Sequence, residues 1–432
     1  MGARMVKRVL MVAFHFPPLR GSSGIQRTLK FAQYLPALGW QPLVLSAHPR
    51  AYANQGPEQL AEIPPQAVVK RAFALDAARH LAWRGRYLGW TAWPDRFATW
   101  CLGAIPAGLA LVRQYRPQVL WSTHPVASAI LIGLALHKLT RLPWVVDLRD
   151  PMTDVNYPRD ARVRAIWRWI ERKAVHNAAL VVCNTPSAVV TYTTRYPELP
   201  RSRFTMLENG YDEENFRHAG ARLAPRAPGA PFTLIHSGII YPSERDPVPL
   251  MRALGELKAE GAIDASQLHI VLRATAHDDY VGGLLAEHGI GDLVSLAPHV
   301  PYQTALAEML SADGLLVLQA SNCNHQIPAK LYEYLRAGRP ILALTDASGD
   351  TAATLRAAGV DTIAPLDDCA GIKRGLLHFL HLARAGQAPL PTPAAVAAAS
   401  RQARTVELAR MLDSLLPQPL ATPATAGSTE DA

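Results

Sequence analysis

The chain alternates short apolar runs with longer amphipathic stretches, and this pattern occurs twice, once on each side of a segment rich in Pro, Gly and Ala. Short buried runs separated by helical patterns are typical of βαβ units, which assemble into parallel sheets covered by helices. With 432 residues, the chain is also longer than one core usually supports. The sequence therefore predicts an α/β protein with two parallel-sheet domains joined by one linker.

The predicted strands set the domain boundaries. In the first half the apolar runs cover residues 8–14, 41–46, 118–122, 144–148 and 180–184, and in the second half they cover 232–236, 268–274, 293–296, 314–319 and 341–344. We predict an N-terminal domain (1–217), a linker (218–231), a C-terminal domain (232–394), a final helix (395–416) and a disordered tail (417–432). Ligands of open parallel sheets bind beyond the carboxyl ends of the strands. Polar residues that directly follow strands are therefore the candidates for function.

The positive charge is concentrated in the first half of the chain. Residues 1–216 hold 27 Lys and Arg against 14 Asp and Glu, whereas residues 217–432 hold 17 Lys and Arg against 21 Asp and Glu. The net charge of the whole chain is +9. Such an asymmetry favours a polyanionic partner for the N-terminal half, either an anionic membrane surface or a nucleic acid. No recognised nucleic-acid module is present, so we expect no nucleic-acid partner.

The segment 79–116 combines six arginines and several aromatic residues with a single acid, Asp95. Trp83, Tyr87 and Trp90 share one face of a predicted helix, and Pro94 precedes a second helical pattern. Two interpretations remain open. The aromatic stripe either packs into the N-terminal domain or forms an interfacial helix on a membrane, where Trp rings lie at the level of the headgroups.

The compartment follows from the cysteines and the apolar runs. Cys101, Cys183, Cys323 and Cys369 lie far apart without CxxC spacing, which predicts neither disulfides nor a zinc site and fits a reducing cytoplasm. The first apolar run is too short for a signal peptide, and none reaches the ~18 residues of a membrane span. We predict a cytoplasmic protein, at most peripheral on the inner face of the cell membrane. Without an Asp-x-Asp pair or clustered ligands, no metal site is predicted.

The most informative polar pair lies in the segment 327–345. Lys330 and Glu333 are three residues apart in a predicted helix that Gly338 ends, so both side chains face the same way. A carboxylate accepts the hydroxyls of a ribose and an ammonium binds phosphate, a combination that suits a nucleotide. The alternative is an ordinary surface ion pair.

Further candidates follow other predicted strands. Gly21 and Gly24 lie in a loop that leads into a helix, where backbone amides and the helix N-terminus favour an anion. His124 follows the run 118–122 and is a hydrogen-bonding candidate. Asp147, Arg149 and Asp150 end the next run, so they either pair with one another or face a polar cleft. In the second half, Gly238 permits close backbone approach and Arg245 suits a pyrophosphate.

The run "IPAKLYEYLRAGRPILAL" (327–344) resembles the donor-nucleotide helix of retaining glycosyltransferases of the GT-B fold, specifically family four. The opening "FPP…G…G…R" and the run "PWVVDLRDP" (143–151) are similar to that family's bacterial polysaccharide-assembly members, and "NGYD" (209–212) resembles its "NGVD" turn. The resemblance implies two Rossmann-like domains facing each other across a cleft, with the last helix crossing back to the first domain. It further implies a glycosyltransferase that is metal-independent and retaining.

The resemblance also implies roles for individual residues. Glu333 is expected to bind the donor ribose, and Arg245 and Lys330 to neutralise the leaving diphosphate. The remaining positions are His124 and Asp150 as catalytic residues, and Gly21, Gly24, Gly238 and His325 as further donor-binding residues. The expected substrates are a nucleotide sugar carrying UDP, GDP or ADP and a glycan or lipid-linked acceptor, with no other cofactor.

Two positions depart from the family pattern. Ile239 stands where the family has an arginine, and His325 stands where it has the first of two glutamates. Two alternatives to a glycosyltransferase therefore stay open. One is a sugar-nucleotide epimerase of the same architecture, and the other is a non-catalytic descendant that binds a nucleotide sugar or a partner protein.

Overall fold

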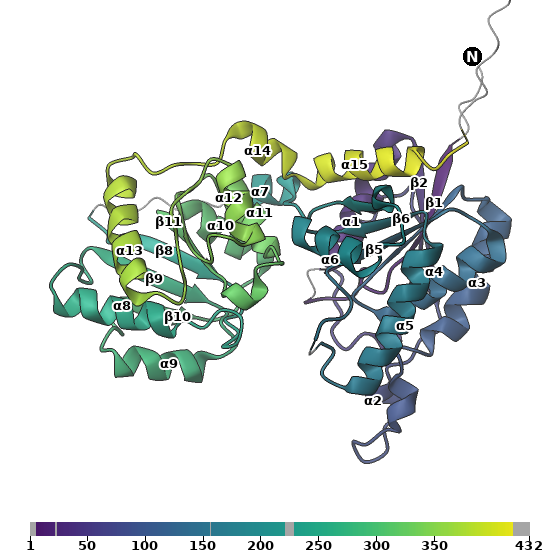
Figure 1. Cartoon of the computed structure of the whole chain (residues 1–432), viewed down its shortest axis with the longest axis horizontal. Helices are drawn as coiled ribbons and strands as arrows, with labels where there is room; N and C mark the ends of the chain where they lie inside the picture. The colour runs from purple at the N-terminus through teal and green to yellow at the C-terminus, as the bar shows by residue number, and fades with distance from the viewer. Residues whose placement is uncertain (1–5, 22–23, 156, 221–228, 418–432) are drawn as a thin grey trace, which may run out of the picture.

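The computed structural model describes residues 6–21, 24–155, 157–220 and 229–417. It has two α/β halves, each built on its own parallel sheet (Figure 1). The predicted fold class is confirmed. Most of the predicted linker (218–231) and nearly all of the predicted tail (417–432) lie outside the described residues, so these two predictions stay untested.

The N-terminal sheet has seven parallel strands in the order β3-β2-β1-β4-β5-β6-β7. Apolar side chains fill both faces of the central strands, as expected for a sheet covered by helices on both sides. The strands are β1 (Lys7–Val12), β2 (Trp40–Ala47), β3 (Val68–Ala72), β4 (Val119–Thr123), β5 (Trp144–Arg149), β6 (Leu180–Cys183) and β7 (Phe204–Met206). The α-helices are α1 (Gly24–Tyr34), α2 (Ala77–His80), α3 (Trp100–Tyr115), α4 (Ala127–Thr140), α5 (Ala161–Asn177) and α6 (Pro186–Arg195). The next helix, α7 (Glu213–Gly220), packs against α10 (Tyr302–Ser311) in the C-terminal half.

The C-terminal sheet has six parallel strands in the order β10-β9-β8-β11-β12-β13. The strands are β8 (Phe232–Ser237), β9 (Leu268–Arg273), β10 (Val294–Ala297), β11 (Gly314–Leu318), β12 (Ile341–Leu344) and β13 (Ile363–Ala364). The helices are α8 (Val248–Ala259), α9 (Asp278–Glu287), α10 (Tyr302–Ser311), α11 (Ala329–Ala337), α12 (Asp350–Ala357), α13 (Cys369–Arg384), α14 (Pro393–Ala398) and α15 (Arg401–Asp413). The short strands β3, β7 and β13 were not predicted, because each is brief or carries charged residues.

In both sheets the strand order reverses beside the first strand, between β1 and β4 and between β8 and β11. Loops that leave such a pair of strands run in opposite directions and open a crevice between them, which is where ligands bind in doubly wound folds. The reversal points therefore select the loops after β1, β4, β8 and β11 as the walls of a site.

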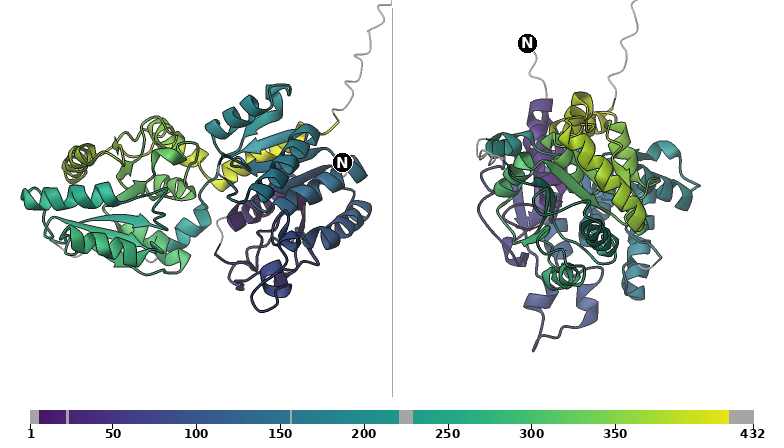
Figure 2. Two further views of the ribbon diagram at one scale, coloured as in Figure 1. Left: turned by 60° about the horizontal axis from the view of Figure 1, so that its bottom comes forward. Right: turned by 90° about the vertical axis from the view of Figure 1, so that its left-hand side faces the viewer.

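The chain crosses between the halves twice, and the two crossing segments are hydrogen-bonded to each other through their backbones. Tyr211 donates its backbone N–H to Ala399 O (3.1 Å) and accepts from the Arg401 N–H (2.8 Å). A Cβ at Gly210 would lie 2.6 Å from Ala399 O, so only glycine permits this approach. After the second crossing α15 packs on the N-terminal half, where Leu408 and Leu412 join the core around β1 (Figure 2). This is the predicted return of the last helix.

Polar contacts hold the facing edges of the two halves together. The Asp350 carboxylate accepts hydrogen bonds from the Ser187 hydroxyl (2.9 Å) and backbone N–H (3.1 Å) at the start of α6. The Thr185 hydroxyl donates to the backbone carbonyl of His325 (2.9 Å), and the Tyr332 hydroxyl donates to Glu208 (3.2 Å). The cleft is therefore closed along this edge.

One local prediction is wrong. Trp83, Tyr87 and Trp90 do not lie on one helix, because α2 ends at His80 and is followed by a tight turn with positive φ at Arg84 and Gly85. A short 3-10 helix follows at Gly89–Ala92. Phe97 and Trp100 pack into the core of the N-terminal domain, as the first interpretation of the aromatic segment expects, but Trp83, Tyr87 and Trp90 are exposed.

Candidate functional site

A cavity of about 150 Å³ lies between the two halves, at the carboxyl edges of both sheets. In the C-terminal half its walls come from the loops after β8 and β11, which the reversal point selects, and from the start of α11. In the N-terminal half they come from the end of β5 and the loops after β5, β6 and β7, whereas the described residues of the loops after β1 and β4 do not line the cavity. The lining residues are Arg149, Asp150, Asn184 and Asn209 from the N-terminal half, and Glu244, Arg245, Gln319, Cys323, Gln326, Ile327, Pro328 and Ala329 from the C-terminal half.

Helix α11 forms the C-terminal wall and carries Lys330 and Glu333. It begins after Pro328 and ends at Gly338, whose φ of 63° is the left-handed cap that the sequence predicted. Leu331 and Leu335 bury one face of the helix in the core, which turns the opposite face toward the cleft. The Tyr334 hydroxyl accepts the Ser237 N–H (3.0 Å) and so ties the helix to the end of β8.

Lys330 lies over the loop that follows β8. A Cβ at Gly238 would come within 2.6 Å of Lys330 Nζ, and the φ of 125° there also favours glycine. The Lys330 ammonium donates to His236 Nε2 (3.4 Å), and His236 Nδ1–H donates to the Leu316 carbonyl (2.9 Å). Burial, followed by repulsion from Arg245, lowers the pKa of Lys330 to about 7, and nearby Glu333 opposes the fall.

Arg245 is the second cation of this wall. Its guanidinium donates to the Ile239 carbonyl (2.8 Å) and lies 5.5 Å from the centre of the Tyr241 ring. Because Arg245 and Lys330 repel each other, an anion placed between them would relieve an unfavourable interaction. The two cations beside Gly238, whose missing side chain lets Lys330 come close, have the composition of a diphosphate site.

Glu333 lies one turn further along α11. The Tyr302 hydroxyl donates to its Oε1 (2.7 Å). Burial raises the pKa of Glu333, and the Tyr302 hydrogen bond, Arg401 and Lys330 act in the opposite direction. One carboxylate oxygen is thus oriented by Tyr302, which leaves the other for a ligand hydroxyl.

His325 lies at the contact between the two halves, and its predicted role in donor binding stays a prediction. Its backbone carbonyl accepts the Thr185 bond between the halves, and its ring lies 3.4 Å from the Gln326 amide. Two backbone amides beside His325 are engaged within the loop, since Asn324 N–H donates to Ser321 O (3.2 Å) and Gln326 N–H to Cys323 O (2.9 Å). His325 therefore contributes at least to closing the cleft.

The N-terminal wall begins with the loop after β1. Gly21 has a φ of 77° and nothing within 4 Å of its missing Cβ. Gly24 opens α1, and a Cβ there would lie 2.6 Å from His15 Nδ1 and 3.2 Å from Arg149 Nη1. Glycine at position 24 thus lets a histidine and an arginine approach the start of a helix. Ser22 and Ser23, which lie between the glycines, are outside the described residues.

Asp147 is structural. Its carboxylate pairs with Arg27 through two bonds (2.8 and 2.9 Å) and accepts the Thr123 hydroxyl (2.8 Å). Both partners of the pair are buried, and Arg27 also donates to the Leu207 carbonyl (2.9 Å). Of the two aspartates in "DLRDP", only Asp150 reaches the cavity, whereas Asp147 holds α1 against β5.

Four polar residues lie close together on the N-terminal side of the cleft: Arg149, His124, Asp150 and His15. Arg149 has a φ of 65°, and its buried Nε lacks a hydrogen-bond partner among the described residues. His124 is 6% exposed and its Nε2 is likewise without a partner in that part of the chain. Burial and the nearby Arg149 lower the pKa of His124 to about 3 and that of His15 to about 4, so both rings are neutral at physiological pH.

Of the predicted site residues, Asp150 and Arg245 line the cavity. Lys330 is not among its lining residues but lies beside Gly238 and close to Arg245 and Glu333. Asn184, which also lines the cavity, and His15, His236 and Tyr302, which neighbour Arg149, Lys330 and Glu333 in that order, were not predicted. His15 and His236 carried a usable signal, since each lies within or directly after an apolar run that ends at the cleft. Tyr302 begins a helix and carried none.

Neither a cluster of metal ligands nor a membrane-spanning helix occurs in the described ranges. No group of three or more His, Cys, Asp or Glu side chains is arranged to hold a metal ion there. In the same residues, no helix is both long and apolar enough to cross a bilayer.

Comparison with known proteins agrees with this geometry. Residues 23–210 match the family described as "Glycosyl transferase 4-like domain". The chain has no significant sequence match among curated proteins.

Among solved structures, the sucrose-phosphate synthase of Thermosynechococcus elongatus superimposes with a TM-score of 0.65 at 15% identity, over 95% of this chain and 99% of that one. The α,α-trehalose 6-phosphate synthase of Burkholderia multivorans gives 0.61 at 10% identity, over 95% and 97%. A protein assigned as a UDP-N-acetylglucosamine 2-epimerase from Listeria monocytogenes gives 0.56 at 10% identity, over 94% and 96%. Residues 23–210 are thus similar to a glycosyl transferase 4-like domain, and the whole chain has the two-domain GT-B fold.

Proposed function

We propose that this protein is a retaining, metal-independent glycosyltransferase that moves a hexose from a nucleotide sugar to a lipid-linked glycan in surface polysaccharide or glycolipid synthesis. The observation that carries the proposal is that Lys330 lies against Gly238, close enough to Arg245 and Glu333 for their charges to affect its pKa. The glycosyl transferase 4-like match and the GT-B neighbours support the same class of reaction.

The donor is assigned to the C-terminal wall. Glu333 accepts ribose hydroxyls, with Tyr302 holding the carboxylate in place. Lys330 and Arg245 bind the diphosphate and neutralise the charge that grows on it as the anomeric carbon–oxygen bond breaks. Fixed charges aimed at a developing anion are usually the largest single contribution to catalysis. Two cations supply here the charge that a metal ion supplies in other sites.

The acceptor and the transferred sugar are assigned to the N-terminal wall. His124 and His15 stay neutral, so they orient sugar hydroxyls by hydrogen bonding and do not act as cationic acids. Arg149 and Asp150 add a charged pair at the cavity. In the proposed reaction the acceptor oxygen bonds to the anomeric carbon on the face that the phosphate leaves, and its proton passes to a phosphate oxygen. No protein nucleophile is required.

The closed cleft is too small for the whole donor. The cavity volume of about 150 Å³ compares with roughly 300–1,000 Å³ for ordinary ligand pockets. We therefore expect the contacts of Ser187 with Asp350, and of Thr185 with His325, to open when the donor enters and to close over it afterwards.

The proposal is tested by calorimetric titration with a panel of UDP-, GDP- and ADP-sugars, followed by NMR of each incubated donor. We expect one donor to bind and to hydrolyse slowly, and Arg245→Ala to abolish both. Arg252→Ala is the matched control, because Arg252 is an exposed arginine of the same domain that pairs with Glu256 (2.9 Å) and does not line the cavity. No binding across the panel would refute the proposal.

The same assay decides between the alternatives. An epimerase would convert the sugar of the bound donor into its epimer without any acceptor, which the NMR spectrum shows directly. A non-catalytic descendant would bind the donor and leave it intact. Turnover that appears only after His325→Glu would support that descendant.

A further inference from the structure

Residues 77–98 project from the N-terminal half between β3 and α3, and we call them the aromatic finger. The finger consists of α2, a tight turn over residues 83–86 and the 3-10 helix Gly89–Ala92. It extends away from the rest of the domain below α5 in Figure 1, and it protrudes in both views of Figure 2 as well.

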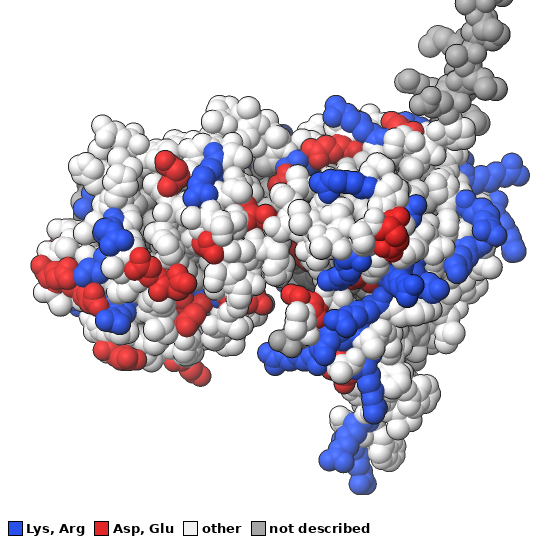
Figure 3. Space-filling model, viewed as in Figure 1, with Lys and Arg blue, Asp and Glu red and all other residues white. Residues whose placement is uncertain are grey.

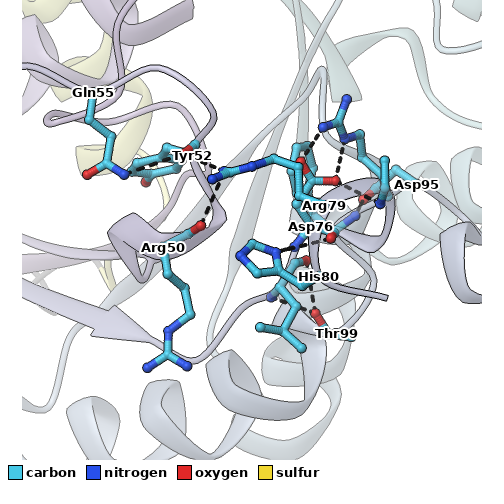
Figure 4. Close-up of polar contacts among 12 residues, drawn as sticks. Arg50, Tyr52, Gln55, Asp76, Arg79, His80, Asp95 and Thr99 are labelled. Atoms are coloured by element: carbon cyan, nitrogen blue, oxygen red, sulfur yellow. Dashed lines mark hydrogen bonds and ion pairs between the residues drawn. The ribbon is translucent and has the colours of Figure 1, made fainter. Parts of the chain in front are cut away.

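The stem of the finger is closed by polar contacts (Figure 4). The buried Asp76 carboxylate caps α2 through the Ala78 N–H (3.1 Å) and pairs with Arg96 (2.7 Å from Nε to Oδ1), which lies across the stem. Arg79 donates to the Tyr52 carbonyl (2.8 Å) and so fastens α2 to the body of the domain. Because its stem is held on both sides, the finger presents its tip in a defined direction.

The tip is apolar and exposed. The side chain of Trp83 is 79% exposed, that of Trp90 64% and that of Leu88 64%, and Tyr87 is also exposed. Exposed apolar side chains that gather in one place mark an interaction surface, whereas scattered ones do not. The tip also contains Arg84 at a φ of 50°, in the left-handed region that residues other than glycine adopt less often.

The chemistry of the tip favours a lipid surface. Residues 81–93 contain Arg84 and Arg86 and no acidic residue. Tryptophan and tyrosine rings lie at the headgroup level of a bilayer, and arginines bind anionic headgroups beside them. Figure 3 shows Lys and Arg gathered on the finger and on the neighbouring surface of the N-terminal half, whereas the C-terminal half carries more acidic side chains on this face. The charge thus complements an anionic surface.

The position of the finger relates it to the site. It follows β3, so it leaves the sheet at the same carboxyl edge as His124 after β4 and Arg149 at the end of β5. Trp167 of α5 links the stem to this wall. Its ring N–H donates to the Pro94 carbonyl (2.8 Å), and the ring packs edge-on against His124 (5.2 Å between ring centres). A surface that holds the finger therefore lies on the acceptor side of the cleft.

We propose that the aromatic finger docks the protein on an anionic lipid bilayer by inserting Trp83, Leu88 and Trp90 at the interface, with Arg84 and Arg86 on the headgroups. The docking presents the N-terminal wall of the cleft to acceptors held in that membrane. The inference rests on the proposed function only in taking the acceptor to be lipid-linked.

The test is co-sedimentation of the full chain with vesicles of phosphatidylglycerol and phosphatidylethanolamine, and with vesicles of phosphatidylcholine alone, at low and high salt. We expect binding to the anionic vesicles that high salt releases. Trp83→Ser combined with Trp90→Ser should weaken that binding at least about tenfold. Arg84→Gln combined with Arg86→Gln should weaken it about tenfold or more and remove most of its salt dependence. All four side chains are exposed, so these variants should unfold like the wild type.

Matched controls lie on the C-terminal half. Leu390→Ser removes an apolar side chain that is 50% exposed, and Arg252→Gln removes an exposed cation, so both should bind vesicles as the wild type does. Brominated lipids should quench the tryptophan fluorescence of the wild type and not that of the Trp83/Trp90 double variant. A wild type that ignores anionic vesicles, or tip variants that bind them normally, would overturn the proposal. Titration with nucleotide sugars is a separate readout, so a failed donor assay with intact vesicle binding refutes only the proposed function.

Discussion

The charge of Lys330 should control how tightly the donor binds, and pH changes that charge without altering the side chain. In the free protein its pKa is about 7, because the ammonium is buried and faces Arg245. A diphosphate beside the ammonium favours its charged form, so binding raises this pKa. The protein therefore takes up a proton on binding the donor wherever the pH lies between the free and the bound values.

The sign and size of the effect follow directly. With a pKa of about 7, Lys330 is roughly 90% protonated at pH 6 and roughly 10% protonated at pH 8. Donor affinity is thus highest below pH 7 and is lost as the pH rises, by about tenfold (~1.4 kcal/mol) between pH 6 and pH 8. His236, the neighbour of Lys330, does not add to this change, because burial holds its pKa well below the usual range.

The assay is isothermal titration calorimetry with the intact nucleotide sugar, whose diphosphate is esterified at both ends and does not titrate in this range. Repeating it in two buffers with different ionisation enthalpies counts the protons taken up. Lys330→Met should bind more weakly and with a flat pH profile, whereas Lys258→Met, which changes a partly exposed lysine paired with Asp292 (2.7 Å), should behave like the wild type. A wild-type affinity that changes less than about twofold between pH 6 and pH 8, or a tenfold change that persists in Lys330→Met, would refute the reasoning.

Three further predictions concern single positions. Glu333→Ala should weaken donor binding by about ten- to hundredfold (~1.5–3 kcal/mol), and Glu333→Gln by less because an amide still accepts one hydroxyl; equal affinities in calorimetry would contradict the ribose assignment. Gly238→Ala should impair donor binding more than folding, because its Cβ displaces Lys330 Nζ, and a thermal melt beside the titration separates the two effects. Arg27→Met should cost about 3–5 kcal/mol in urea unfolding by leaving Asp147 charged and buried, and an added Asp147→Leu change should recover much of it; a loss below about 1 kcal/mol would show that the pair is not needed.

Much of the architecture is local and could be predicted. The alternation of apolar runs identified the two sheets, and the i, i+3 spacing of Lys330 and Glu333 with Gly338 behind them placed α11 correctly at the cleft. The sequence did not predict the edge strands β3, β7 and β13, which are short or carry charged residues. The helix predicted over Trp83 and Trp90 was wrong, because their helical spacing falls on a turn. Spacing alone does not record a positive φ.

The unpredicted parts of the site depend on pairs far apart in sequence. Arg27 and Asp147 are 120 residues apart, and His236 and Lys330 are 94 apart. The residues adjacent in sequence to each member do not indicate its partner, because these contacts form only when the folded sheet brings the two segments together. The buried pair explains why Asp150 and not Asp147 faces the cavity, which the sequence left undecided.

A crystal structure of the protein with the nucleotide sugar selected by the panel would test the central claim most directly. We expect the ribose hydroxyls on the Glu333 carboxylate, the diphosphate between Lys330 and Arg245 over Gly238, and the sugar toward His124. A nucleotide bound elsewhere, or one bound in the cleft with its ribose away from Glu333, would contradict the assignment of this site.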